Sequence, residues 1–445
     1  MEVGLRCPSL RWGSCSAAVP NPTVEIAWIV LHRGANGPLN ISPSKPAVET
    51  NITKFYVATF FGSLSFATGF LVFYCRKLGF SFSQIFLVSV VYEVLNFLLE
   101  IPTGVLADFW SRKRVIISGT LISGLSFFVV SIRPEAYVTY IIWSVLSAIC
   151  TTLNSGSVDA FIYDTVQAIN PDEYPKVVGR ISAIALTTQA ISLPIGGWLT
   201  NLYGFRYALV LSGIAGVLQA LIISSTVEIP GVNRKEAVQF HSVRGIAQQF
   251  NEQIRTSFSI LFGQTIVRSV LLYGILFFVV AEFATVIYQP YYSDLGYDSE
   301  TAIAIFSASF LVIQAISSMI AGHIATPKNQ RVLLAAVSAG LCLPLLVLRF
   351  APLGIPSFVL FYFAMGVGEV VLSNTMNGLI PSDKRATILS AQNQLASITY
   401  AIAALAMGPL FDRLDVTGGA FAVGAVVLVL FVLVMSRANL KEAAE

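Results

Sequence analysis

The chain has 445 residues, of which 55% are hydrophobic and only 11% are charged, and its formal net charge is +3. Soluble domains carry about 25% charged residues, and a mean hydropathy of +0.75 would leave too much apolar surface in contact with water. These values exclude a soluble globular protein and indicate that lipid surrounds most of the chain.

Residues 1–50 differ from the rest of the chain because they contain six prolines and scattered charges. Their one apolar run, residues 24–32, is too short to cross a bilayer, which needs about 20 helical residues. We therefore predict that this segment is a disordered cytoplasmic tail, or a stretch upstream of the true start of the protein.

Twelve segments of membrane-spanning length follow, in two groups of six, and they predict an all-α polytopic membrane protein. We expect a first six-helix bundle over residues 53–227 and a second over residues 263–437. A cytoplasmic linker over residues 228–262, with an amphipathic helix, joins them, and residues 438–445 form a cytoplasmic tail. The segments are residues 55–75, 78–107, 115–132, 136–158, 181–205, 207–227, 269–293, 301–327, 332–348, 350–382, 386–411 and 416–436.

Lysine and arginine are unevenly distributed over the predicted loops. The loops after even-numbered spans hold thirteen of these cations, including Arg112, Lys113 and Arg114, whereas the opposite loops hold six. Because positive loops remain on the cytoplasmic side, we predict that both termini and the loop at Asp108 are cytoplasmic. The six opposite cations are Arg76, Lys77, Arg133, Arg206, Arg349 and Arg413.

The loop between spans 2 and 3 carries the motif Gly104-x-Leu-Ala-Asp108-x-x-x-Arg112-Lys113. This motif resembles the loop signature of the major facilitator superfamily of secondary transporters, over roughly residues 53–437. The resemblance implies twelve helices in two pseudo-symmetric halves that rock around a midplane cavity. The chain departs from the pattern at Phe109 and Ser111, where the family favours arginine and glycine.

The resemblance also implies a conformational latch that closes the cytoplasmic face. We expect Gly104 to allow a close approach of span 2 to a neighbouring helix, and Asp108 to pair with the N-terminus of span 11. Arg112 would bond an acid at the inner end of span 4, which by location is Asp164. Glu100 lies one turn before Gly104 and is expected to belong to the same latch.

Four acids at lipid depth are candidates for proton or substrate coupling: Glu93, Asp159, Glu282 and Glu369. Such acids cost about 2.5–3.5 kcal/mol on insertion scales, and removal from water favours the protonated form of a carboxyl group. In the family that the chain resembles, spans 1, 4, 7 and 10 line the cavity, so the last three would face it. The alternative interpretation is that each acid only bonds a neighbouring helix.

Span 5 contains Leu193-Pro194-Ile195-Gly196-Gly197, which is similar to the glycine-proline-glycine signature of drug-exporting members. Ten aromatic residues on presumed lining helices suit a bulky apolar cargo, although ordinary packing also accounts for them. They are Phe66, Phe70, Phe73, Tyr92, Tyr140, Trp143, Phe278, Tyr288, Phe361 and Tyr362.

We therefore predict a proton-coupled exporter of small amphipathic compounds, with proton-coupled uptake of a nutrient or metabolite as the alternative. No hydrolase, phosphate-binding or histidine-rich motif indicates an enzyme. The widely spaced cysteines and histidines predict no metal and no cofactor, and the dispersed cations predict no nucleic-acid binding. We expect a monomer in the plasma membrane whose partners are a small molecule, protons and lipid.

Overall fold

The computed structural model describes residues 45–228, 255, 265–326, 328–350, 353–380 and 385–437. Within these ranges the chain forms helices and no strand. The predicted tails lie outside them up to residue 44 and from residue 438, whereas residues 45–50 of the predicted disordered tail are helical. The predicted linker helix also lies outside these ranges, apart from Glu228 and Arg255.

The first half of the bundle begins at Lys45, ahead of the predicted start at residue 53. Its main helix contacts join α5 with α6 and α9, α4 with α6, and α2 with α9. The elements are α2 (Lys45–Gly62), η1 (Thr68–Phe70), α3 (Leu71–Lys77), α4 (Phe82–Phe109), α5 (Arg112–Ile132), α6 (Tyr137–Asn154), α7 (Ser157–Ile169), η2 (Pro171–Glu173), α8 (Tyr174–Tyr203) and α9 (Phe205–Ser224).

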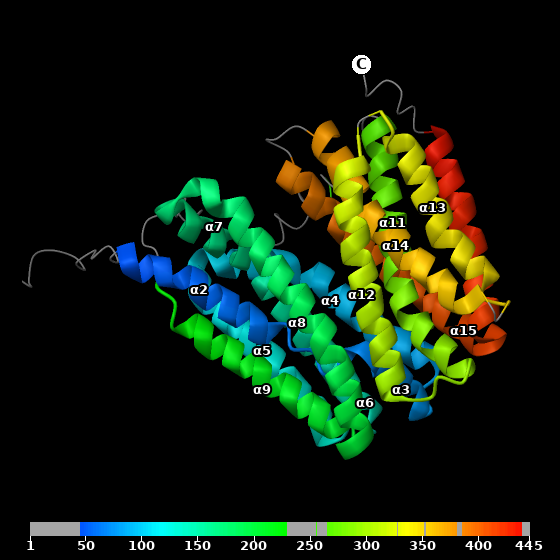
Figure 1. Ribbon diagram of the computed structural model, residues 1–445, viewed down its shortest axis with the longest axis horizontal. Helices are drawn as coiled ribbons and strands as arrows, with labels where there is room; N and C mark the ends of the chain where they lie inside the picture. Colours follow the sequence, from blue (N-terminus) through cyan, green and yellow to red (C-terminus); the bar gives the residue numbers. More distant parts are fainter. Residues whose placement is uncertain are drawn as a thin grey trace, which may run out of the picture. The chain divides into compact units, whose positions relative to one another are not determined.

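The second half contains five long helices, which Figure 1 shows in yellow-green to red. Within it α11 lies against α15, and α14 lies against both α12 and α13. The elements are α11 (Thr265–Asp294), α12 (Glu300–Ile324), α13 (Gln330–Val347), α14 (Gly354–Leu379) and α15 (Arg385–Arg437).

Ten helical segments of the described residues are long and apolar enough to cross a membrane. One of them is α15, which contains two spans joined at Asp415, where φ is 63°. Predicted span 1 is not among the ten, because a break after Gly62 divides it into α2, η1 and α3. When α15 is counted as two spans and the divided span 1 is added, the ten segments account for the twelve predicted spans. The predicted all-α fold is confirmed.

The break in span 1 is held by side chains from distant helices. Ser192 and Ser212 accept hydrogen bonds from the backbone N–H groups of Ser65 and Phe66. Beyond the break, the Phe73 N–H donates to Gln289 Oε1 at 3.0 Å, and α3 contacts α11 and α12. Because α2 contacts mainly α7, α8 and α9, it is the later part of span 1 that reaches the second half, while the Tyr74 ring of α3 also lies against Phe205 of α9.

The halves meet along two helix pairs, α4 with α15 and α8 with α12. Polar contacts between them gather at the end of the bundle that carries Lys77, which we call the Lys77 end. There Lys77 Nζ lies 3.0 Å from Glu300 Oε1, and Asn201 donates to Thr301 at 2.7 Å. The opposite end, at which α4 ends and α5 begins with Arg112, is called the Arg112 end.

Candidate functional site

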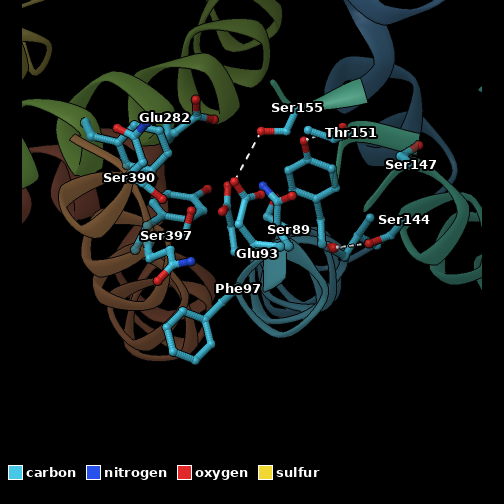
Figure 2. A pocket seen from close by; sticks show the side chains of 18 of the residues that line it. Ser89, Glu93, Phe97, Ser144, Ser147, Thr151, Ser155, Glu282, Ser390 and Ser397 are labelled. Carbon is cyan, nitrogen blue, oxygen red and sulfur yellow. Dashed lines mark hydrogen bonds between the residues drawn. The ribbon is translucent and has the colours of Figure 1, made fainter. Parts of the chain in front are cut away.

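A cavity of about 1060 Å³ lies between the halves, with walls from α4, α6, α11 and α15 and from the start of α7. Figure 2 shows Glu93 near the middle, with Glu282 and Ser397 on one side and Thr151 and Ser155 on the other. Pockets for drug-sized ligands have volumes of about 300–1,000 Å³. The cavity is therefore large enough for such a molecule.

One face of α4 supplies the acids at the centre of the cavity. Ser89, Glu93, Asn96 and Glu100 all line it, and their spacing of three or four residues places them on one side of a helix. The Ser81–Gln84 capping box starts this helix by satisfying its first N–H groups. Pro102 interrupts α4 only after the lining face has ended.

Glu93 is buried without a full set of partners. Its side chain is 4% exposed, and its Oε2 atom has no hydrogen-bond partner. Ser397 of α15 lies within hydrogen-bonding reach of the same carboxyl group. Buried polar atoms are nearly always paired, so the free oxygen of Glu93 is a candidate contact for a proton or a ligand.

A second polar face comes from α15 and was not predicted from the sequence. Ser390, Asn393, Gln394 and Ser397 line the cavity, and Gln394, which is 7% exposed, has an unpartnered Nε2 atom. The signal in the sequence is a set of polar residues at i, i+3, i+4 and i+7 within an apolar segment. That spacing predicts one polar face on an otherwise lipid-facing helix.

The cavity is strongly acidic. Glu93, Glu100, Asp159 and Glu282 line it, and none of the described lining residues is Lys, Arg or His. Glu282 of α11 lies across the cavity from Glu93 (Figure 2). A cleft lined by charges of one sign and by low-dielectric walls raises the local concentration of counter-ions, so this cavity favours cations.

Glu369 is the predicted coupling acid that the structure does not bring to this cavity. It lies on α14, where Gln314 Nε2 of α12 donates to its Oε1 atom at 2.7 Å. The expectation that Glu369 would face the cavity is therefore wrong. Its side chain lies at the contact between α12 and α14. The other three predicted coupling acids all line the cavity.

The residues predicted as a latch lie at or near the Arg112 end. Arg112 forms an ion pair with Asp164, and Glu100 accepts a hydrogen bond from Ser155 at 3.2 Å while lining the cavity. The predicted close approach at Gly104 is absent here, since a Cβ atom added there meets no described heavy atom within 4 Å. The side chain of Asp108 lies outside the described residues, so its role stays a prediction.

Most of the ten aromatic residues pack between helices rather than line the cavity. Tyr92, Trp143 and Phe278 are lining residues, whereas Phe70 and Phe361 are fully buried in the hydrophobic core. Tyr400 of α15 lines the cavity and was not among the ten. The packing interpretation is therefore correct for most of the set.

Aromatic rings close the cavity toward the Lys77 end. Phe86 of α4, Phe283 of α11 and Phe411 of α15 are at most 1% exposed, with ring centroids 5.2–6.1 Å apart. Toward the Arg112 end, in contrast, Ser155 and Asp159 line the cavity and are exposed. The cavity is therefore sealed at the Lys77 end and reaches the surface on the Arg112 side.

Two halves of membrane-length helices around a polar cavity that is sealed at one end are the layout of a secondary membrane transporter. The comparisons agree with this class: the family model of the Major Facilitator Superfamily matches residues 55–398. The chain belongs to this superfamily and is a multi-pass secondary transporter of a small molecule.

Known relatives support the same assignment. The chain is similar to the "Uncharacterized MFS-type transporter YxaM" of Bacillus subtilis (strain 168), with 24% identity over 372 residues, 81% of this chain and 88% of the relative. Two solved structures share the fold at low sequence identity. One is a POT family transporter in complex with 5-aminolevulinic acid, with a TM-score of 0.67 and 14% identity over 89% of this chain and 97% of that chain. The other is a bacterial homolog of the human lysosomal transporter Spinster, in an inward-facing, unoccupied conformation, with a TM-score of 0.66 and 15% identity over 90% and 98%.

Proposed function

We propose that this transporter exports positively charged amphipathic compounds in exchange for protons. The observation that supports the proposal is the acidic cavity, in which four carboxyl groups are accompanied by no described Lys, Arg or His. Aromatic side chains such as Tyr92 and Phe278 supply apolar and cation-binding surface in the same cavity. A protonated amine on an apolar body matches both features.

Glu93 and Glu282 are the proposed exchange site. Two ionised carboxyl groups in one water-poor site repel each other, and either a proton or a substrate cation relieves the repulsion. Because both ligands use the same oxygens, each displaces the other. Exchange then follows when the cavity opens alternately at the two ends of the bundle.

The change of access requires the halves to separate at the Lys77 end. The Phe86–Phe283–Phe411 cluster and the Lys77–Glu300 pair would open. The Arg112 end would close at the same time, and the predicted latch at Gly104 and Asp108 is proposed to hold it closed. The Arg112–Asp164 pair, which is already formed within the first half, would position that loop. We propose that this end is cytoplasmic, on the basis of its lysines and arginines.

The test follows ethidium, a lipophilic monocation, in proteoliposomes with an imposed pH gradient. Exchange for protons predicts accumulation in an acidic lumen, whereas uptake together with protons predicts accumulation in an alkaline lumen. Glu93→Gln and Glu282→Gln should abolish the gradient-driven movement, and Glu369→Gln should retain it because Glu369 lies outside the cavity. Full coupled movement by both cavity variants would show that the exchange site is misassigned.

A further inference from the structure

We propose that the preferred substrate is an elongated dication whose two positive charges lie about 10 Å apart, the spacing of two acidic pairs in the cavity. The deep pair is Glu93 and Glu282, and the entrance pair is Glu100 and Asp159. The proposal rests on the proposed function, which requires a cationic substrate, and adds to it the number and spacing of the charges.

The spacing follows from α4. Glu93 and Glu100 are seven residues apart on this helix and both line the cavity. At 1.5 Å per residue, their backbones are separated by about 10 Å along the helix axis. Because α4 runs from the Lys77 end to the Arg112 end, Glu93 is the deeper acid and Glu100 the one nearer the open side.

Each of these acids has a second carboxylate in its neighbourhood. Glu282 lies across the cavity from Glu93, as Figure 2 shows. Ser155 donates to Glu100, and Asp159, in the first turn of α7 four residues after Ser155, lines the cavity as well. One monocation neutralises charge at one pair only, whereas a dication of suitable length reaches both.

Unpartnered atoms indicate that a ligand completes the deep part of the site. Glu93 and Gln394 are 4% and 7% exposed, yet Glu93 Oε2 and Gln394 Nε2 lack partners, as does Asn96 Oδ1. Two of these three atoms are acceptors, and an ammonium group supplies up to three donors. A protonated amine at this depth would satisfy Glu93 and Asn96 together.

The part of α4 between the two acids presents one amide, Asn96, and one aromatic ring to the cavity. Phe97 lies between Glu93 and Glu100 in the sequence and lines the cavity. An aliphatic chain advances about 1.25 Å per bond when extended, so about eight methylene groups place two amines at the required separation. The proposed substrate class is therefore a long-chain diamine, whose protonated amino groups carry the N–H donors that the deep acceptors require.

The experiment measures binding to the purified full-length protein by calorimetry at constant pH. The three probes are octamethylenediamine, trimethylenediamine and octylamine, which separate the effect of the second charge from that of chain length. We expect octamethylenediamine to bind about tenfold more tightly than either other amine, the equivalent of about 1.4 kcal/mol. Equal affinity for octamethylenediamine and octylamine would overturn the proposal.

Variants assign the effect to the entrance pair. Glu100→Gln should weaken octamethylenediamine binding about tenfold more than octylamine binding, because only the diamine places a second charge at Glu100. Glu100→Asp, which keeps the charge, should restore most of the advantage, and the matched control Asp172→Asn removes an exposed carboxylate of η2 and should change neither. If Glu100→Gln weakens both amines equally, its role is structural and the dication proposal fails.

Ethidium transport distinguishes this proposal from the proposed function. If ethidium exchanges for protons but the long diamine has no advantage, the proposed function stands and the dication inference is wrong. If neither ethidium nor any amine is moved or bound, the cationic substrate class itself is wrong.

Discussion

Asp412 closes the Lys77 end of the transporter by capping a helix of the opposite half. Its Oδ1 atom accepts a hydrogen bond from the Phe82 N–H at 2.7 Å. Its Oδ2 atom accepts from the Ser83 N–H at 3.0 Å and from the Ser83 hydroxyl at 2.6 Å. These donors form the N-terminus of α4, so the carboxylate joins α15 to α4 only while this end is closed.

The Asp412→Asn substitution should shift the conformational equilibrium toward opening at the Lys77 end. The amide keeps one acceptor but turns an NH₂ group toward Ser83 and removes the negative charge. An anion at an exposed helix N-terminus contributes about 0.3–1 kcal/mol, and more when partly buried. Since Asp412 is exposed but accepts three hydrogen bonds, we expect about 1 kcal/mol, or about a fivefold change in the ratio of the two states.

The assay is a distance measurement between spin labels on the two halves. Ile132 at the end of α5 and Phe350 after α13 are 67% and 62% exposed, and both lie near the Lys77 end. Labels at these positions, in a background without native cysteines, report the separation of the halves. The long-distance population should grow about fivefold in Asp412→Asn.

Asp415→Asn is the matched control for this measurement. Asp415 accepts hydrogen bonds from Gly418 and Thr417 within its own turn of α15, and none of these contacts crosses to the other half. Ser81 continues to cap α4 in both variants. An unchanged distance distribution in Asp412→Asn, or an equal shift in both variants, would refute the reasoning.

Three further predictions use the same labelled protein or the transport assay. Lys77→Gln should shift the spin-label distances less than Asp412→Asn does. The Lys77 side chain is 49% exposed, and exposed ion pairs contribute only about 0–1 kcal/mol. A larger shift in Lys77→Gln would contradict this ranking. Gly197→Ala should favour opening at the Lys77 end, because the added Cβ atom would lie 2.6 Å from the Glu300 carbonyl oxygen. Overpacking of this kind destabilises the closed contact by about 1–3 kcal/mol. Gly179→Ala in the same helix meets no atom within 4 Å and should leave the distances unchanged. Asp108→Asn should slow ethidium movement at saturating concentration by weakening the predicted latch, and an unchanged rate would count against that role.

Hydropathy was sufficient to predict the helices but not their breaks. The spans are long, apolar and separated by charged loops, so their existence follows from the cost of placing charge in lipid. The break after Gly62 has only a weak local signal, Gly62-Ser63 without a proline, and the distant Ser192 and Ser212 satisfy the freed N–H groups. A break of this kind depends on tertiary contacts that a single span does not encode.

The candidate site was predicted in part, and for a physical reason. Glu93, Asp159 and Glu282 stood out because charge is rare at lipid depth. Glu369 met the same criterion, yet the sequence does not show which side of α14 faces the cavity, and the structure pairs it with Gln314. The uncharged lining residues of α15, such as Gln394, were not predicted. An amide costs less free energy in lipid than a carboxylate and therefore gives a weaker signal in an apolar segment.

The divided first span has a consequence for biosynthesis. Phe73 and the Gln289 side chain that accepts its N–H are 216 residues apart in the chain. At about 5–20 residues per second, the ribosome completes α3 about 10–40 s before it makes that acceptor. During this interval the seven-residue α3 has neither α11 nor α12 to dock on, and an unpaired N–H group in lipid costs several kcal/mol. In the nascent first half, α3 therefore lacks its partners in α11 and α12 until the second half has been synthesised.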